Sequence, residues 1–203
     1  MNHLEKVGPL KNRYVLLRHG ESEANEAGLI ISNLERGLNE YGLTALGREQ
    51  VASSVVEAKE KGVLNNEAII YSSDFKRAAE TANIAREKLN SDTVHLTPAL
   101  RERYFGDFDN KSHKNYVRVW ANDISKRADN SHNVEALENV LARTTKLIID
   151  LENEYSNKTI LLVGHADTLQ VLQTAFEGVH PSRHRLLNSI SVAEVRELKQ
   201  KVV

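Results

Sequence analysis

The chain has 203 residues, of which 40% are hydrophobic and 27% charged, a composition typical of one folded domain. Its net charge of -1 provides no general attraction for nucleic acid or an anionic membrane, and the absence of cysteine excludes disulfides, thiolate catalysis and cysteine metal ligands. The polar residues 1–12 lack the apolar core of a signal peptide, and no apolar run approaches the ~20 residues of a spanning helix. We therefore expect a cytoplasmic protein that binds neither nucleic acid nor membrane.

The first part of the chain predicts a strand, a long polar stretch and a helix. The strand expected over residues 13–17 is apolar and ends abruptly in Arg18-His19-Gly20, which is typical of a buried strand. Residues 21–42 are polar and irregular, and their length favours a substrate loop over a simple connector. Residues 44–61 predict a helix with one apolar face, which Gly62 ends.

Another strand, helix and strand are predicted next. An apolar run predicts a strand at residues 68–71, and Ser72-Ser73-Asp74 offers capping side chains for a helix over residues 75–89. Residues 94–96 are expected to form a second short strand. Residues 97–111 contain a proline, a glycine and several acids, which indicates a loop.

Two helices of unequal clarity are predicted in the middle of the chain. Residues 112–127 show only a weak helical pattern, whereas residues 134–155 carry a continuous apolar stripe and predict the clearest helix. We expect residues 100–133 to form a cap or lid that is inserted between elements of the core.

The last part of the chain completes an alternation of strands and helices. Residues 159–163 predict a strand and residues 168–176 a helix, with Asp167 placed where an N-cap belongs. Alternating apolar residues at 189–198 suggest a final strand. The order of elements predicts a single α/β domain over residues 1–203, with a largely parallel sheet covered by helices.

Two of the predicted strands end in a histidine, and one of them also ends in an arginine. Arg18 and His19 follow the first strand, and His165 follows residues 159–163 after a glycine. In open α/β sheets, ligands bind just beyond the carboxyl ends of the strands, so we expect a pocket that holds these three side chains. Taken singly, each histidine could be a structural residue, and only their combination favours a site.

The residue types near this pocket suit phosphoryl transfer. A phosphate ester needs several hydrogen-bond donors, which the planar fork of arginine supplies. A neutral imidazole can act as nucleophile, and a second histidine can stabilise the transferring group. Arg77 lies near the start of a helix, where it would add to the positive potential of the helix N-terminus. Glu102 opens the expected cap and is the best candidate for the acid that protonates the leaving group.

Several motifs follow one another along residues 14–176. They are Arg-His-Gly-Glu at 18–21 with Asn25, the segment 43–50, Ser-Ser-Asp at 72–74 with 77–82, Leu-Arg-Glu at 100–102 followed by Gly106, the segment 135–143, and Val-Gly-His at 163–165. Together they resemble the histidine phosphatase superfamily, in the branch of cofactor-dependent phosphoglycerate mutases and related phosphatases. Any one motif alone would be weak, but their shared order makes the resemblance specific.

The resemblance implies a three-layer αβα sandwich, with a mostly parallel sheet, helices on both faces and a small cap insertion. It also implies that no metal and no organic cofactor take part. The implied site residues are His19 as phosphoryl acceptor, Arg18, Arg77 and His165 as the phosphate pocket, Glu102 as proton donor and Asn25 as a further phosphate contact.

Departures from the mutase pattern favour hydrolysis over transfer. After residues 117–120 the mutases continue with paired arginines that hold the substrate carboxylate, whereas this chain has Ala121-Asn122. Asp167 stands where small residues are usual, and the neighbours of Glu135 also differ, which leaves the roles of Asp167 and Glu135 open. We predict a phosphomonoesterase that acts on a small phosphorylated metabolite. The alternatives are a phosphoglycerate mutase and a catalytically silent module that binds phosphate or a phosphoprotein.

The remaining polar and aromatic residues are given structural roles. Arg183-His184-Arg185 is expected to be a solvated turn, with contact to an anion as the less favoured alternative, and His113 is expected on the surface or in a loop. Tyr116 and Trp120 are expected to pack a cap helix, although Trp120 could line the pocket mouth. The sequence predicts neither the natural substrate nor the oligomeric state.

Overall fold

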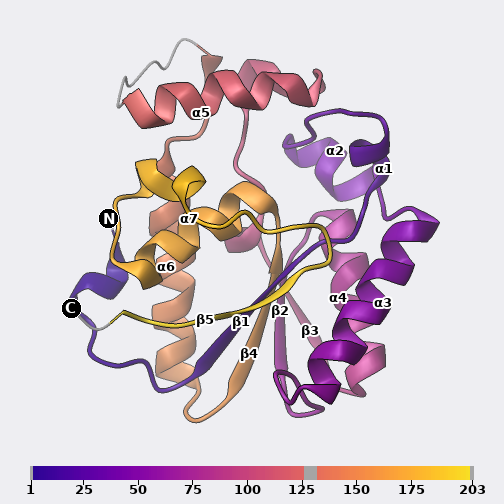
Figure 1. The fold of residues 1–203 in the computed structure, drawn as a ribbon, viewed down its shortest axis with the longest axis vertical. Coiled ribbons are helices and arrows are strands. Elements are labelled where there is room, and N and C mark those ends of the chain that lie inside the picture. Colours follow the sequence, from indigo (N-terminus) through magenta and orange to yellow (C-terminus); the bar gives the residue numbers. More distant parts are fainter. Residues whose placement is uncertain (1, 126–131, 202–203) are drawn as a thin grey trace.

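Five strands form one sheet in the order β3-β2-β4-β1-β5 (Figure 1). The computed structural model describes residues 2–125 and 132–201. Its strands are β1 (Arg13–Arg18), β2 (Ile69–Ser73), β3 (Val94–Thr97), β4 (Thr159–Gly164) and β5 (Val195–Leu198). The first four run parallel to one another, and β5 pairs antiparallel with β1. The predicted α/β fold with a mostly parallel sheet is confirmed.

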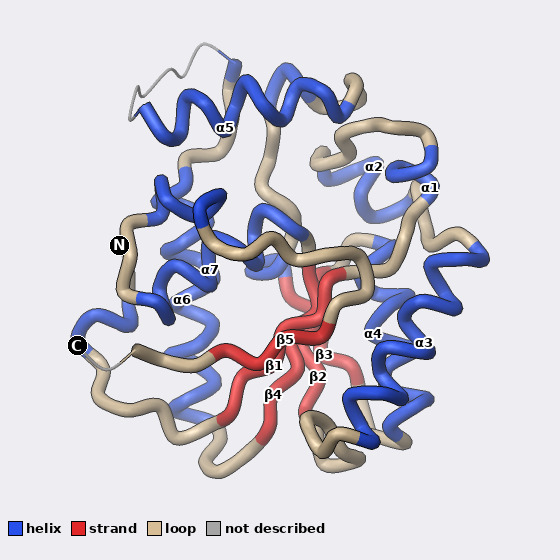
Figure 2. The backbone as a smooth tube through the Cα atoms, in the orientation of Figure 1, coloured by secondary structure: helices blue, strands red, loops and turns tan. Residues whose placement is uncertain are grey.

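Helices cover both faces of the sheet, which makes three layers. The long helices are α3 (Ala45–Glu60) and α4 (Lys76–Leu89) on one face, and α6 (Leu137–Glu154) and α7 (Ala166–Glu177) on the other (Figures 1 and 2). Tyr14 and Leu16 of β1 join the apolar cluster under α6 and α7, while Val15 and Leu17 join the cluster under α3 and α4. This alternation is the two-residue period of a strand that is buried on both faces.

The strand register brings the two predicted histidines to the same end of the sheet. Arg18 pairs with Gly164 in the parallel ladder of β1 and β4. The backbone amide of His19 donates to the carbonyl of Gly164 at 3.0 Å. His19 and His165 therefore leave neighbouring strands side by side.

The segment expected to be an irregular loop at 21–42 contains two short helices, α1 (Glu23–Glu26) and α2 (Leu34–Asn39). A reciprocal capping box between Ser22 and Asn25 starts α1. The final strand, expected over 189–198, begins only at Val195. The residues before it bend away, with Ala193 in the left-handed region at a φ of 56°.

Two expected helix caps are wrong. α4 begins after Phe75 without a side-chain cap, because the Asp74 carboxylate instead binds the guanidinium of Arg101. α7 begins at Ala166, two residues earlier than expected, so Asp167 lies in its first turn rather than at its N-cap. In both cases the carboxylate that was expected to cap a helix binds an arginine from another part of the chain.

Short helical pieces make up the expected cap region and the residues just before it. They are η2 (Pro98–Leu100), which ends where the expected cap begins, and then η3 (Gly106–Phe108), η4 (His113–Asn115) and α5 (Tyr116–Ser125), the last running across the end of the molecule in Figure 1. Residues 97–111, expected as a loop, hold the first two of these turns. Val119 of α5 packs with Ile30 and Phe105 in a small apolar cluster of its own. Residues 126–131 of the expected cap lie outside the described residues.

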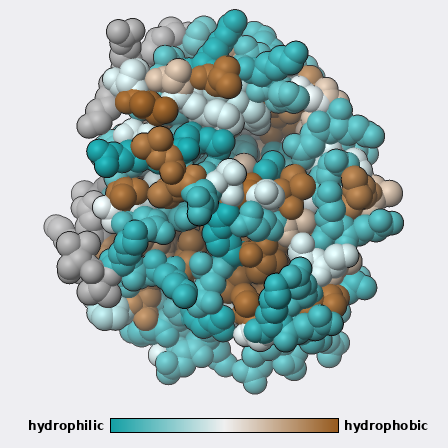
Figure 3. All heavy atoms as spheres, viewed as in Figure 1, coloured by the Kyte–Doolittle hydropathy of each residue, from teal (hydrophilic) through white to brown (hydrophobic). Residues whose placement is uncertain are grey.

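Two further turns lie near the chain ends, η1 (His3–Lys6) and η6 (Pro181–Leu186). The face seen in Figure 3 is mostly hydrophilic, with hydrophobic patches that are small and scattered. Scattered patches of this kind are normal on a folded domain. Of the helices in the described ranges, none has both the length and the apolarity of a membrane span.

Candidate active site

A cavity of about 340 Å³ lies beyond the carboxyl ends of β1 and β4. Its size is at the lower end of the range for small-molecule sites. Five of the six predicted site residues line it, namely Arg18, His19, Asn25, Arg77 and Glu102. The sixth, His165, lies behind His19, and the two ring centroids are 5.1 Å apart. The structure therefore brings together residues that are up to 147 positions apart in the sequence, from Arg18 to His165.

His19 is buried at the end of β1 with one ring nitrogen free of a proton. Its Nδ1 lies 2.7 Å from the carbonyl oxygen of Gly20, and since a carbonyl can only accept, Nδ1 carries the hydrogen. The lone pair is then on Nε2, which accepts a hydrogen bond from Nε of Arg77 at 3.2 Å. Burial, followed by the charges of Arg77 and Arg18, lowers the pKa of His19 well below its ordinary value. His19 is therefore a neutral imidazole at neutral pH.

His165 is fully buried and is neutral for the same reasons. Its Nε2 lies 3.0 Å from the hydroxyl of Ser73, and the ring of Phe75 packs edge-on against it. Burial and the charge of Arg77 hold the pKa of His165 well below its ordinary value. Ser73 thus fixes the ring orientation from the neighbouring strand β2.

Arg18 and Arg77 are anchored by backbone carbonyls rather than by acids. Nη1 of Arg18 donates to the carbonyl of Ile190 at 2.9 Å, and Nη2 of Arg77 donates to that of Ile31 at 2.9 Å. Neutral anchors orient the guanidinium groups and leave their positive charges uncompensated. Two guanidinium groups held in this way at one cavity are suited to binding an anion.

Three buried polar atoms in this region have no hydrogen-bond partner within the described part of the chain. They are Nε of Arg18, Nη1 of Arg77 and Nδ1 of His165. The one other such atom in that part, Oγ of Ser91, lies beyond the opposite end of α4. Buried polar groups are normally paired, so three unpaired ones in a single region indicate a ligand with several acceptor oxygens.

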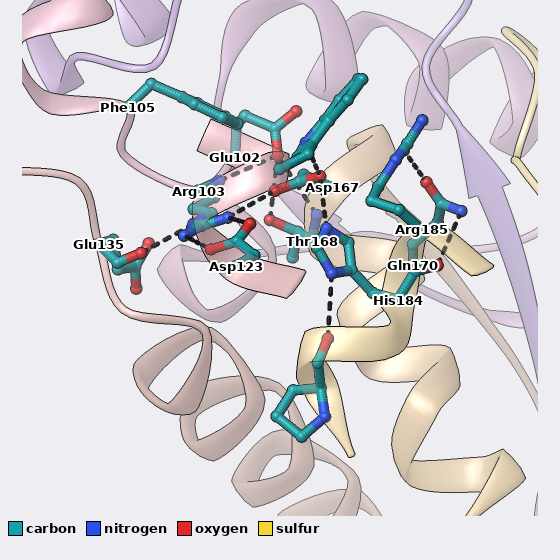
Figure 4. Close-up of polar contacts among 12 residues, drawn as sticks. Glu102, Arg103, Phe105, Asp123, Glu135, Asp167, Thr168, Gln170, His184 and Arg185 are labelled. Atoms are coloured by element: carbon teal, nitrogen blue, oxygen red, sulfur yellow. Dashed lines mark hydrogen bonds and ion pairs between the residues drawn. The ribbon is translucent and has the colours of Figure 1, made fainter. Parts of the chain in front are cut away.

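Glu102 is buried with one carboxyl oxygen fixed by donors (Figure 4). Its Oε1 accepts from the backbone amide of Arg103 at 2.9 Å and from that of Thr168 at 3.3 Å. Burial, followed by the nearby charge of Asp167, raises the pKa of Glu102 above its ordinary value, although Arg77 acts in the opposite direction. A carboxyl group in this setting holds a proton more readily than an exposed one.

Asn25 lies exposed at the rim of the cavity. Its Oδ1 accepts from the amide of Ser22 at 3.1 Å and from the hydroxyl of the same residue at 2.9 Å. This capping box occupies the oxygen of the side chain, so any contact of Asn25 with a bound anion would come from its amide nitrogen.

Asp167 is the centre of a buried polar network that the sequence did not predict (Figure 4). One of its oxygens accepts from Arg103 at 3.2 Å, and the other accepts from the indole of Trp120 at 2.9 Å and lies 3.1 Å from Nε2 of His184. Arg103 also forms a two-point ion pair with Asp123 at 2.7 and 2.8 Å. The network connects α5, α7 and η6, and it borders the cavity through Asp167 and Trp120.

The expectation of a solvated turn at 183–185 is confirmed for Arg183, which is exposed, but is wrong for the two residues that follow it. His184 is fully buried, and Arg185 lines the cavity with its guanidinium 3.7 Å from the ring centroid of Trp120. Tyr116 stacks on Trp120 with centroids 5.2 Å apart, and both residues line the cavity. The position of these residues could have been inferred from the topology. The chain leaves α7 at residue 177 and must return to the edge of β1 by residue 195, so the residues between them pass the site.

His113, which was expected on the surface, and Glu135, whose role was left open, lie on different sides of the cavity wall. The exposed His113 also lines the cavity. Glu135 does not line it, and its carboxylate instead pairs with Arg143 at 3.0 Å while its backbone carbonyl accepts from Arg103. Glu135 thus supports the fold around the site.

Comparison with known proteins gives consistent relatives. The chain is 29% identical over 183 residues to a 2,3-bisphosphoglycerate-dependent phosphoglycerate mutase from Bartonella henselae, and the match covers 84% of each chain. It is 24% identical over 200 residues to a metal-independent phosphoserine phosphatase from Arabidopsis thaliana, with 96% of this chain and 81% of the relative covered.

The solved structure of a mycobacterial glucosyl-3-phosphoglycerate phosphatase matches the fold with a TM-score of 0.74 at 24% identity, over 91% of both chains. A family model described as the histidine phosphatase superfamily (branch 1) matches residues 14–202. Since this match covers nearly the whole sequence, the chain belongs to the histidine phosphatase superfamily, in its branch 1.

Proposed function

We propose that this protein is a phosphomonoesterase that hydrolyses a small phosphorylated metabolite through a phosphohistidine intermediate on His19. The three buried, unpartnered atoms of Arg18, Arg77 and His165 carry the proposal. A tetrahedral phosphoryl group is the ligand whose several oxygens can accept from all three. The neutral His19 lies beside them, with its lone pair on Nε2.

In the first half-reaction the phosphoryl oxygens are bound by Arg18, Arg77 and His165. The Nε hydrogen bond of Arg77 transfers from the imidazole to a phosphoryl oxygen, which frees the lone pair of His19. Nε2 attacks the phosphorus in line, the bond between phosphorus and the ester oxygen breaks, and Glu102 gives its proton to the leaving oxygen. The raised pKa of Glu102 keeps that proton available.

In the second half-reaction the carboxylate of Glu102 takes a proton from water. The resulting hydroxide attacks the phosphorus, the bond between phosphorus and Nε2 of His19 breaks, and inorganic phosphate leaves. Glu102 is again protonated and His19 again neutral, so the enzyme returns to its starting state. Arg18 and Arg77 stabilise the charge on the transferring group in both steps.

Hydrolysis is favoured over a mutase by the residues that follow Trp120. Ala121 and Asn122 carry no charge, so this part of α5 provides no cation to retain a phosphorylated acid between the half-reactions. We also propose that the reaction needs no metal, because Arg18 and Arg77 supply the positive charge at the phosphate. The Arabidopsis relative is named as metal-independent. Residues 100–133 act as the cap of a single domain in this proposal.

The test is hydrolysis of an aryl phosphate in the presence of EDTA, by wild type and His19→Ala. His95→Ala is the matched control, because His95 is exposed on β3 and stacks on Tyr71 outside the cavity. We expect wild type and control to be active and His19→Ala to lose activity by at least a thousandfold. Rapid acid-free quenching should trap a phosphoenzyme in wild type and in His95→Ala but not in His19→Ala.

Full activity in His19→Ala would refute the mechanism. If wild type is inactive towards every phosphomonoester offered, the silent binding module replaces the phosphatase as the best reading. Conversion of 3-phosphoglycerate to 2-phosphoglycerate faster than release of phosphate would instead establish a mutase.

A further inference from the structure

His184 is a fully buried histidine whose two ring nitrogens both face oxygens that accept hydrogen bonds. Its Nδ1 lies 3.0 Å from the backbone carbonyl oxygen of Pro181, and its Nε2 lies 3.1 Å from Oδ1 of Asp167 (Figure 4). Asp167 is a carboxylate at neutral pH, because its pKa is about 2. Either neutral tautomer of His184 would point a lone pair at one of these oxygens, whereas an imidazolium donates to both. The contacts therefore fit the doubly protonated ring.

Among the described residues, two largely buried acids of this network share a single arginine. The guanidinium of Arg103 donates to Asp123 at 2.7 and 2.8 Å and to Asp167 at 3.2 Å. One guanidinium balances only one of the two carboxylates, and a buried charge without a partner of opposite sign is costly. A positive charge on His184 gives Asp167 a cation of its own and balances the network.

The other groups around His184 do not take its place as that cation. Arg185 follows on the same turn and its charge acts on Asp167, but it forms no ion pair with Asp167 within 4 Å and it lines the cavity. From α5 come the acid Asp123 and the neutral indole of Trp120, which donates to Asp167. Helix α6 also packs against η6, and within the described part of the chain none of its charged side chains bonds to that turn.

The network reaches the proposed acid of the reaction through the backbone. Oε1 of Glu102 accepts from the backbone amides of Arg103 and Thr168. Thr168 directly follows Asp167, so the charge of Asp167 acts close to the Glu102 carboxyl and raises its pKa. A cation bound to Asp167 offsets part of this effect, because it makes the surroundings of Glu102 less negative.

We propose that His184 is a positively charged positioning residue, an imidazolium that pairs with Asp167 and sets the charge under which Glu102 transfers its proton. The pair lets Glu102 release its proton as well as hold it, which a group that serves first as acid and then as base requires. The proposal rests on the function proposed above for the role of Glu102, whereas the charge of His184 follows from its own contacts.

The charge of His184 is measured directly by nuclear magnetic resonance. Long-range proton–nitrogen spectra of the full chain, labelled with nitrogen-15 histidine, report how many hydrogens each imidazole ring carries. Comparison with His184→Gln assigns the signal. We expect His184 to hold both hydrogens at about pH 7.5, where an ordinary exposed histidine is mostly neutral. A neutral ring at that pH would overturn the proposal, whatever the effect of the substitution on activity.

The effect on Glu102 is measured from the pH dependence of kcat/KM for an aryl phosphate, in wild type, His184→Gln and Arg183→Gln. Glutamine can still donate to Asp167 but carries no charge. Arg183→Gln is the matched control, because it removes a positive charge from an exposed position on the same turn. We expect His184→Gln to shift the alkaline decline of kcat/KM upward by roughly half a pH unit, and the control to leave it in place. The shift is upward because the loss of a nearby positive charge raises the pKa of Glu102.

An unchanged alkaline decline in His184→Gln, with or without a fall in activity, would overturn the proposal and leave His184 with a structural role. An equal shift in Arg183→Gln would overturn it as well, because any charge on the turn would then have the same effect. If wild type releases no phosphate, it is the proposed function that fails. The carbon-13 signal of the Glu102 carboxyl, titrated in the same three proteins, still tests the expected shift in that case.

Discussion

Replacing Asp167 with asparagine removes a buried negative charge while it keeps the shape of the side chain. The remaining oxygen can still accept from the indole of Trp120, but the side facing Arg103 loses its charge. Arg103 keeps its two-point ion pair with Asp123, so the variant is expected to fold. The expected cost is therefore the electrostatic part of the network and not its packing.

The size of that cost follows from the ionisation of Asp167. Burial alone raises the pKa of Asp167, but the hydrogen bond with His184 and the charge of Arg103 outweigh it and lower the pKa from an ordinary 3.8 to about 2. At about 1.4 kcal/mol for each pH unit, the difference corresponds to roughly 2 kcal/mol of unfolding free energy. Because the folded-state pKa is the lower one, this stabilisation is complete above about pH 5 and is lost as the pH falls from the ordinary value through about 2.

Urea unfolding of wild type and Asp167→Asn, followed by circular dichroism from pH 7 to pH 3, measures this cost. We expect a constant difference of roughly 2 kcal/mol down to about pH 5 and a difference of about half that size at pH 3. Asp150→Asn is the control, since Asp150 forms an exposed pair with Lys146 and its loss should cost under about 1 kcal/mol. A difference below about 0.5 kcal/mol at pH 7, or one that does not change with pH, would refute the reasoning.

Three further predictions concern catalysis and packing. Since Asp167 helps to raise the pKa of Glu102, whose acid form is the proton donor, Asp167→Asn should shift the alkaline decline of kcat/KM to lower pH, and an unchanged profile would contradict this. A change from glycine to alanine inside a helix usually stabilises it, but Gly47→Ala should lower the melting temperature by several degrees, because the new Cβ would lie 2.0 Å from the carbonyl oxygen of Glu21. An unchanged or higher melting temperature would contradict this prediction. Leu162→Ala, in the fully buried centre of β4, should lower the free energy of unfolding in urea by about 2–5 kcal/mol and leave KM unchanged. A loss below about 1 kcal/mol would show that the core collapses into the space left by the leucine side chain.

The sheet was predictable because its signal is local. β1 and β4 are buried on both faces, so their sequences are nearly continuous apolar runs, and both end where a titratable residue appears. Once the strands are parallel neighbours, His19 and His165 must meet at one end of the sheet. This part of the candidate site therefore follows from the strand pattern and a single topological rule.

The helix caps and the outer wall of the cavity were not predictable in this way. Asp74 and Asp167 both have the local setting of a cap, but each carboxylate is taken by an arginine distant in sequence, which no local rule contains. Arg185 lies in a short polar stretch whose composition predicts an exposed turn. Its position over Trp120 depends on how η6 packs against α5, which only the folded chain fixes.

The helices that wall the cavity differ in how many amino-acid substitutions they can accept. Every residue of α7 from Asp167 to Phe176 is buried, so a substitution there disturbs the core as well as the site. α5, by contrast, buries only Val119 among its described residues, and it faces the cavity beside the turn that carries Arg185. Substrate specificity can therefore change in evolution through substitutions in α5 and η6, while the reacting groups at the strand ends stay the same. Laboratory evolution of new substrate ranges should begin with libraries at positions 116–120 and 185–189.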